Sequence, residues 1–207
     1  MNDEIVFYHN PMSRAAIVRR MLEEVGVPYR VELLRFDRGD HKQPSYLRIN
    51  PMGKVPTIVH RGIVVTEAAA ICTYLADAFP EARLAPAIDD PRRGIYLRWL
   101  FFGAGCVEPA ISDHALSRTS APASAIGYGS YDDVVRALHL AIEPGPFVLG
   151  EQFSAADVYL GSQVVWGLMT KSLTPTPELA AYAQRCSERP AAQRARALDE
   201  ALGAQLR

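Results

Sequence analysis

Residues 50–71 constrain the fold of this chain most strongly. They contain the run NPMGKVPTI at residues 50–58 and, a short turn later, TEAAAI at residues 66–71. Because the residue before a proline avoids the helical region, Val55 is expected to be extended, with its backbone unpaired on the proline side. The pattern predicts a strand entered through a proline, a tight hairpin, and a helix that begins near Glu67. The first N–H groups of that helix lack acceptors, so they can bind a carboxylate.

Hydrophobic periodicity predicts a β-α-β unit before this segment. Residues 5–9 are a short apolar run, residues 15–25 are apolar at helical spacing, and residues 29–35 alternate as a second strand. The hairpin at His60–Gly62 and a helix at residues 67–79 follow. A mixed four-stranded sheet is therefore expected.

The remainder of the chain reads as helical, with proline and glycine between the helices. The expected helices are residues 92–116, 131–143, 154–170, 177–187 and 191–206. Gly103-Ala104-Gly105 permits a kink or close packing in the first of them. Ser154 and Asp157 have the spacing of a helix capping pair, which indicates a role in folding rather than catalysis.

Composition excludes several classes of protein. The chain has 207 residues and a formal charge of −1, so nucleic acid and anionic membrane are not expected partners. Its acidic start and the lack of a long apolar stretch indicate a cytoplasmic protein. The three cysteines lack a CxxC spacing and the five histidines lack ligand spacing, so neither a disulfide framework nor a metal site is expected.

Three motifs together resemble those of the cytosolic glutathione transferases. They are FYHNPMSR at residues 7–14, the pair of runs at residues 50–58 and 66–71, and GEQFSAAD at residues 150–157. The resemblance spans nearly the whole chain and includes the serine-type active site of bacterial-type members. It implies an α/β thioredoxin-like, glutathione-binding domain at residues 1–79, a linker at 80–90, and an all-α domain at 91–207 that lines the electrophile pocket. It also implies a homodimer.

The resemblance implies that glutathione is a co-substrate whose thiol is activated for attack on an apolar electrophile. Ser13 resembles the catalytic serine, although the same position suits a helix cap. Tyr8 and Asn10 compete for this role. Instead of activating the thiol, Tyr8 could be a core residue of its strand, and Asn10 could be an ordinary turn residue before proline.

The resemblance also implies which residues hold the tripeptide. Glu67 would face the γ-glutamyl amino group, and Val55 would pair with the peptide backbone before a cis Pro56. Most relatives have a serine after the acid, whereas this chain has Ala68, which leaves the backbone N–H of Ala68 and Thr66 for the γ-glutamyl carboxylate. Glutathione affinity is therefore expected to be weakened.

Positive charge is expected near the glycine carboxylate of glutathione. His41, Lys42 and Lys54 resemble the family's contacts there, with solvated surface cations as the alternative. The expected electrophile pocket involves Met12 and one face of the helix from residue 92, where Tyr96, Trp99 and Phe102 are spaced three apart. Periodicity alone would place most of these aromatic residues in the core.

Two other functions fit the same sequence. A glutathione-dependent peroxidase or isomerase would use the same thiol site. The second alternative is a binding or assembly module that has kept the fold without the activity. Ala68 is the reason to retain this alternative, because a fold does not imply an activity.

Overall fold

The computed structural model describes residues 3–118 and 121–206 and divides the chain into two compact units. One unit, here the sheet unit, combines the residues up to Ala82 with the segment from Pro190 onward. The other, here the helical unit, comprises Arg83–Arg189. Within the described ranges, no helix has the length and apolar character needed to cross a membrane.

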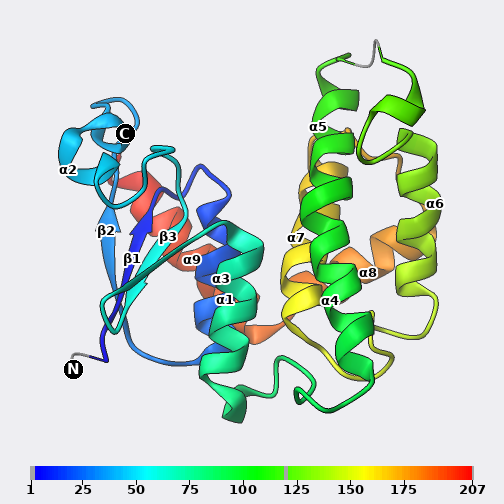
Figure 1. Cartoon of the computed structure of the whole chain (residues 1–207), viewed down its shortest axis with the longest axis horizontal. Coiled ribbons are helices and arrows are strands. Elements are labelled where there is room, and N and C mark those ends of the chain that lie inside the picture. The colour runs from blue at the N-terminus through cyan, green and yellow to red at the C-terminus, as the bar shows by residue number, and fades with distance from the viewer. Residues whose placement is uncertain (1–2, 119–120, 207) are drawn as a thin grey trace. The chain divides into compact units, whose positions relative to one another are not determined.

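The sheet unit contains a four-stranded mixed sheet (Figure 1). Its strands are β1 (Ile5–His9), β2 (Tyr29–Leu33), β3 (Thr57–His60) and β4 (Ile63–Thr66), in the order β2-β1-β3-β4. Strand β1 is parallel to β2 and antiparallel to β3, and β3 is antiparallel to β4. The thioredoxin-like sheet expected from the sequence is confirmed.

The alternation of β1 assigns its side chains to two faces. Ile5, Phe7 and His9 are fully buried, whereas Val6 and Tyr8 are half-buried. The guanidinium of Arg19, on the first helix, lies over the Phe7 ring at 5.8 Å from its centroid. The odd-numbered residues of β1 therefore lie on the face of the sheet that α1 covers.

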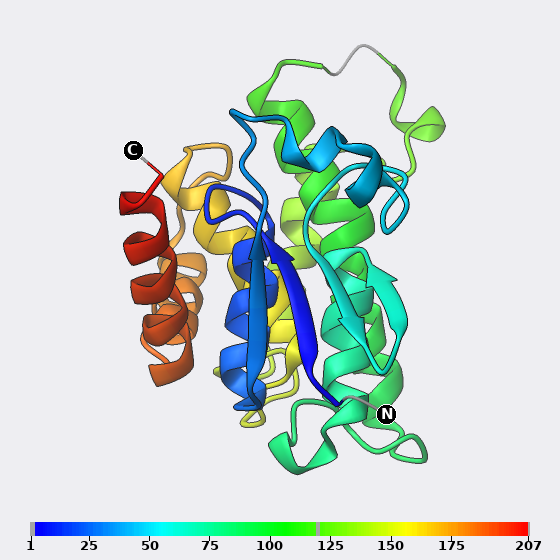
Figure 2. The ribbon, with the colours of Figure 1, turned by 90° about the vertical axis from the view of Figure 1, so that its left-hand side faces the viewer.

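Four helices belong to the sheet unit. They are α1 (Ala15–Val25), the short α2 (Pro44–Leu47), α3 (Ala68–Ala78) and α9 (Pro190–Ala204). Helix α1 ends at Gly26, whose φ of 75° suits a residue without a Cβ atom. Helices α1 and α3 pack together, and α9 packs along α1, as the blue and red helices show (Figure 2). Short 3₁₀ turns occur at Asp40–Lys42 and Pro80–Ala82.

The helical unit contains α4 (Arg92–Phe102), α5 (Glu108–Ala115), α6 (Tyr131–Ile142), α7 (Ala155–Met169) and α8 (Pro177–Ser187), with a 3₁₀ turn at Ala123–Ala125. A π-helical segment, Gly103–Val107, joins α4 to α5 where the sequence permitted a kink. A Cβ atom on Gly103 would lie 2.9 Å from the Tyr159 ring, so this glycine also permits close packing against α7.

The capping pair of α7 is confirmed. The Ser154 amide and hydroxyl both donate to Asp157 Oδ2, at 3.0 and 2.9 Å. The other carboxylate oxygen accepts from the Val148 amide at 2.9 Å and from the Tyr182 hydroxyl at 3.0 Å. Asp157 is therefore a buried acceptor that fixes the start of α7 to α8 and to the segment before α7.

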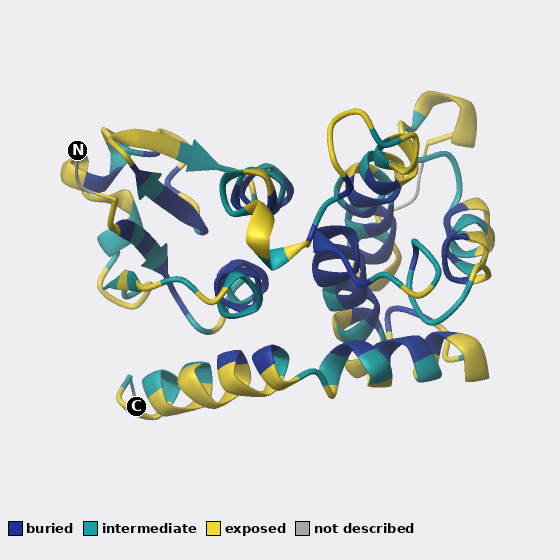
Figure 3. Ribbon diagram, turned by 90° about the horizontal axis from the view of Figure 1, so that it is seen from below, coloured by how far each residue is buried: buried dark blue, intermediate teal, exposed yellow. Residues whose placement is uncertain are grey.

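The division of the chain into two units differs from the expected domains, which were separated by a linker at residues 80–90. Residues 80–82 group with the sheet unit, and the segment from Arg83 groups with the helical unit, where Leu84 accepts a hydrogen bond from the Ala155 amide at 2.7 Å. The last helix was expected in the second domain at 91–207, but α9 belongs to the sheet unit. Buried residues mark only one side of this helix, which ends near the C label in Figure 3.

Candidate functional site

The strand registers bring three loops and the start of α3 to one end of the sheet. Tyr8 near the end of β1 pairs with Thr57 at the start of β3, and Thr57 pairs with Thr66 at the end of β4. His9 pairs with Leu33, so β2 ends at the same end of the sheet. The loops at residues 10–14, 34–43 and 53–56 and the start of α3 therefore converge there. These segments contain most of the site residues expected from the sequence.

The β1–α1 loop is held by its own hydrogen bonds. The Asn10 side chain donates to the Leu34 carbonyl at 2.8 Å and accepts from the Met12 amide at 3.0 Å. The Ser13 hydroxyl donates to the Asn10 carbonyl at 2.6 Å and accepts from the Ala15 amide at 3.1 Å. Ser13 thus binds the first amide of α1 from the position before the N-cap residue Arg14, and both Asn10 and Ser13 organise the loop.

Tyr8 lies on the other face of β1 from the buried residues. Its ring is 5.3 Å from that of Tyr46 on α2, and burial raises the pKa of its hydroxyl. These contacts fit the packing role that the sequence left as the alternative for Tyr8.

The backbone at Val55 is available to a ligand. Val55 is half-buried, and within the part of the chain that the structure describes its amide and carbonyl have no hydrogen-bond partner. The Val55–Pro56 peptide bond is cis, as the resemblance implied. The preceding Lys54 carbonyl accepts hydrogen bonds from the Tyr46 hydroxyl at 2.5 Å and from the Asn50 side-chain Nδ2 at 2.9 Å. An extended peptide could therefore pair with a backbone that is already held in position.

The start of α3 provides further donors. The first intrahelical bond runs from the Ile71 amide to the Glu67 carbonyl, at 2.9 Å. The amides of residues 68–70 therefore have no acceptor within the helix. Glu67 itself is exposed and has φ 63° and ψ 116°, a backbone conformation rare for a residue with a side chain. No sequence pattern predicted this conformation.

The three expected cations have different surroundings. The Lys42 ammonium donates to the Met52 carbonyl at 3.0 Å, which joins the 34–43 loop to the 50–54 turn. The His41 ring is 4.8 Å from that of Phe36, with an edge-to-face arrangement. Lys54 is exposed. Of the three, Lys42 thus has a structural contact that the sequence did not predict.

Comparisons with known proteins agree with this geometry. Residues 4–77 match the family model described as glutathione S-transferase, N-terminal domain. Glutathione S-transferase D7 of Drosophila melanogaster is 27% identical over 179 residues, which cover 83% of this chain and 80% of that protein. Glutathione S-transferase GstA of Escherichia coli O157:H7 is 29% identical over 169 residues, which cover 77% of this chain and 78% of that protein.

A crystal structure of a glutathione transferase homologue from Sulfitobacter, with bound glutathione, superposes with a TM-score of 0.75. It is 25% identical and covers 97% of this chain and 99% of that chain. This chain is a homologue of the glutathione S-transferases. It has the glutathione transferase fold, with the family's N-terminal domain at residues 4–77.

The aromatic residues expected to line the electrophile pocket of this transferase homologue differ in exposure. Tyr96 is fully buried and Trp99 is 5% exposed, as periodicity alone favoured. Phe102 is half-buried and packs edge-to-face on Trp99 at 5.5 Å. Met12, in the β1–α1 loop, is 84% exposed. Met12 and Phe102 therefore have accessible surface, each within its own unit, whereas Tyr96 and Trp99 are core residues.

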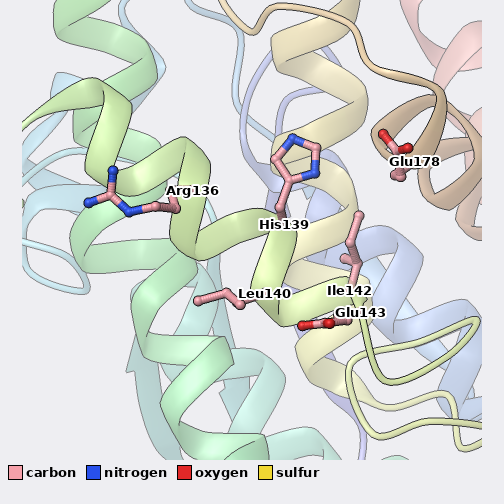
Figure 4. Close-up of a pocket in the computed structure, with 6 residues that line it drawn as sticks. All are labelled: Arg136, His139, Leu140, Ile142, Glu143 and Glu178. Carbon is pink, nitrogen blue, oxygen red and sulfur yellow. The ribbon is translucent and has the colours of Figure 1, made fainter.

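A shallow pocket of the homologue's helical unit contains none of the expected site residues. Six side chains line it, from α6, from the residue that follows α6, and from α8: Arg136, His139, Leu140, Ile142, Glu143 and Glu178 (Figure 4). The strand ends, not this depression, bring together the residues expected to bind the peptide.

A buried polar cluster beside the β1–α1 loop was not predicted from the sequence. His9 Nε2 and Arg19 Nε each lie 2.6 Å from Asp199 Oδ1 on α9. His9 and Arg19 are buried, and Asp199 is half-buried. No local pattern links residues 190 positions apart, although charged residues on otherwise apolar faces of β1 and α1 were a signal that they needed partners.

Proposed function

We propose that this protein is a glutathione transferase that binds glutathione at the convergent end of the sheet. The observation that carries the proposal is the combination there of an unpaired backbone at Val55, before cis Pro56, and the open amides at the start of α3. Glutathione is a short peptide with carboxylates at both ends, so it requires backbone pairing and anion binding together. The glutathione bound in the Sulfitobacter relative supports the same ligand.

Each part of the tripeptide has a candidate partner. Its backbone pairs with Val55 beside cis Pro56. The γ-glutamyl carboxylate accepts from the Ala68 amide and the Thr66 hydroxyl, and the γ-glutamyl amino group faces Glu67. The glycine carboxylate lies near the cations Lys54, His41 and Lys42. Lys42 contributes charge while its ammonium stays on the Met52 carbonyl.

Thiol activation is assigned to Ser13. Its hydroxyl lies at the start of α1, where the helix dipole favours negative charge. Rotation about the Cβ–Oγ bond turns its proton from the Asn10 carbonyl to the glutathione sulfur, which lowers the thiol pKa. Asn10 and Tyr8 are the alternative donors; their side chains already bind Leu34 and stack on Tyr46, respectively.

The reaction is attack of the thiolate on an apolar electrophile. With a chlorodinitrobenzene, the sulfur forms a bond to the ring carbon, the C–Cl bond breaks, and chloride leaves with the electron pair. Positioning of the thiolate beside the acceptor supplies the catalysis. Met12 and Phe102 are proposed to contact the acceptor. A glutathione-dependent peroxidase or isomerase would use the same thiolate.

A homodimer is part of the proposal. Strand β4 is at one edge of the sheet and exposes Ile63 and Val64, with 60% and 43% of their surface accessible. An exposed apolar edge strand favours association with another surface. Light scattering of the purified chain tests this, and a monomer at micromolar concentration would contradict it.

The decisive experiment follows the thiolate absorbance of bound glutathione as a function of pH. An apparent thiol pKa well below that of free glutathione is expected for the wild type, and a smaller depression for Ser13→Ala. Ser187→Ala, on α8 of the helical unit, is the matched control. Bound glutathione with an unchanged pKa would favour the binding-module alternative. If Ser13→Ala matches the wild type, the thiol activator is another residue.

The specific observation that favours the module is Ala68, because it removes a side-chain donor from the γ-glutamyl site. Absence of glutathione binding, together with a stable partner that copurifies, would establish that alternative.

A further inference from the structure

The C-terminal helix α9 has two polar contacts with β1 and α1, from Asp199 and Arg194. Its buried residues are Ala191 and Ala195, each with a single methyl group. Such small side chains provide little apolar area to fix the position of a 15-residue helix. Directional contacts from Asp199 and Arg194 supply the constraint instead.

Asp199 makes the more buried of the two contacts. One of its oxygens, Oδ1, is 2.6 Å from both His9 Nε2 and Arg19 Nε. Because a carboxylate only accepts, His9 must donate from Nε2. Burial lowers the pKa of His9, which favours the neutral ring, so the pair is a neutral histidine and an arginine that share one acceptor.

These two partners flank the β1–α1 loop. His9 is the last residue of β1 and directly precedes Asn10, whereas Arg19 is on the second turn of α1. Residues 10–14 are the covalent connection between them. Asp199 therefore clamps both ends of the loop that contains Ser13, and the hydrogen bonds from Ser13 and Met12 to Asn10 transmit that constraint.

The second contact of α9 is at the other end of α1. Arg194 binds the side chain of Glu23 at 3.1 Å and its carbonyl at 3.0 Å, near the last residue of α1. Tyr29 donates to Glu23 at 2.7 Å and accepts from Arg19 at 3.2 Å. Both anchors attach the same helix, but only Asp199 reaches the residues beside the loop.

We propose that Asp199 is a positioning residue for thiol activation: through His9 and Arg19 it sets the geometry of the β1–α1 loop that presents Ser13 to glutathione. This rests on the proposed function. Since a displacement of about 1 Å can lower a rate by about 10²-fold, a clamp on the loop matters for turnover even without contact with glutathione.

The direction in which the thiol pKa of bound glutathione changes when Asp199 is replaced distinguishes positioning from a simple charge effect. Removing a nearby anion would, by electrostatics alone, favour the thiolate and lower the thiol pKa. Loss of the Ser13 contact would instead raise it toward that of free glutathione. The two mechanisms thus predict opposite shifts for the same substitution.

The test compares Asp199→Asn and Asp199→Ala with Arg194→Ala, the matched control that loosens the same helix at its other anchor. For the Asp199 variants we expect a raised thiol pKa of bound glutathione and a kcat lowered by about 10- to 10²-fold with chlorodinitrobenzene. Their KM for glutathione should change by less than about twofold, since Val55 and α3 supply the binding. Arg194→Ala should retain the wild-type thiol pKa and kcat.

Thermal unfolding of all variants accompanies the kinetics, and the isosteric Asp199→Asn serves if Asp199→Ala does not fold. An unchanged or lowered thiol pKa in the Asp199 variants, or equal losses in Arg194→Ala, would overturn the positioning role alone. A wild-type protein that does not lower the thiol pKa would overturn the proposed function and this inference with it.

Discussion

Replacement of Asp157 by alanine should destabilise the protein strongly. Asp157 is fully buried, and its two oxygens accept from four donors: the amides of Val148 and Ser154 and the hydroxyls of Ser154 and Tyr182. Burial raises the pKa of this carboxyl and the four hydrogen bonds oppose that rise, so part of their energy offsets desolvation of the charge. Alanine would leave the donors in the interior without an acceptor.

The magnitude follows from these contacts. An unsatisfied buried donor costs about 1–3 kcal/mol, but the hydroxyls can rotate and water can enter the space, so the four costs do not add fully. We expect a loss of about 3–4 kcal/mol, typical of breaking a buried charged network. At about 2–4 °C per kcal/mol for a chain of this size, the melting temperature should fall by about 6–16 °C.

Guanidinium unfolding followed by circular dichroism measures this loss. Tyr182→Phe is the matched control, because it removes one donor and leaves Asp157 with three, at a cost of about 1 kcal/mol. If Asp157→Ala costs no more than Tyr182→Phe, the carboxylate does not organise the start of α7 as argued.

Three further predictions concern the sheet unit. Ala68→Ser should tighten glutathione binding by about 1 kcal/mol, as measured by calorimetry, and unchanged affinity would contradict the weakened γ-glutamyl site. Gly53→Ala should destabilise by about 1–3 kcal/mol in thermal melts, because φ is 58° and a Cβ atom would lie 2.7 Å from the His41 carbonyl oxygen. Burial lowers the pKa of His9 and His60 below 6.5, so the unfolded chain binds protons first as pH falls. The contribution of the two neutral histidines to stability should therefore be fully present above pH 6.5 and be lost as the pH falls below it. A melting temperature constant from pH 7 to 5 would refute this.

The elements that the sequence predicted well have strong local signals. The hairpin is encoded by the glycine at position 62, α8 by Pro177 at its start, and α7 by the pairing of Ser154 with Asp157. These signals act over a few residues, so periodicity and turn chemistry are sufficient to find them.

The features that the sequence did not predict depend on contacts between distant residues. The membership of α9 in the sheet unit rests on Asp199 meeting His9 and Arg19, which no local pattern encodes. The unusual backbone of Glu67 occurs at the junction of β4 and α3, and no local sequence pattern predicts it. At the candidate site, the residue types were found from motifs, whereas the hydrogen bond from Ser13 to the Asn10 carbonyl required coordinates.

The return of α9 to the sheet unit also bears on how the protein forms in a cell. The strands and α1 are made first, but the carboxylate that neutralises buried Arg19 is contributed by residue 199. As the chain leaves the ribosome, the whole helical unit is therefore translated before the first unit can complete its interior. Until then Arg19 and His9 need water, so the nascent first unit should remain loosely folded and open to proteolysis, and synthesis of the final helix should close it.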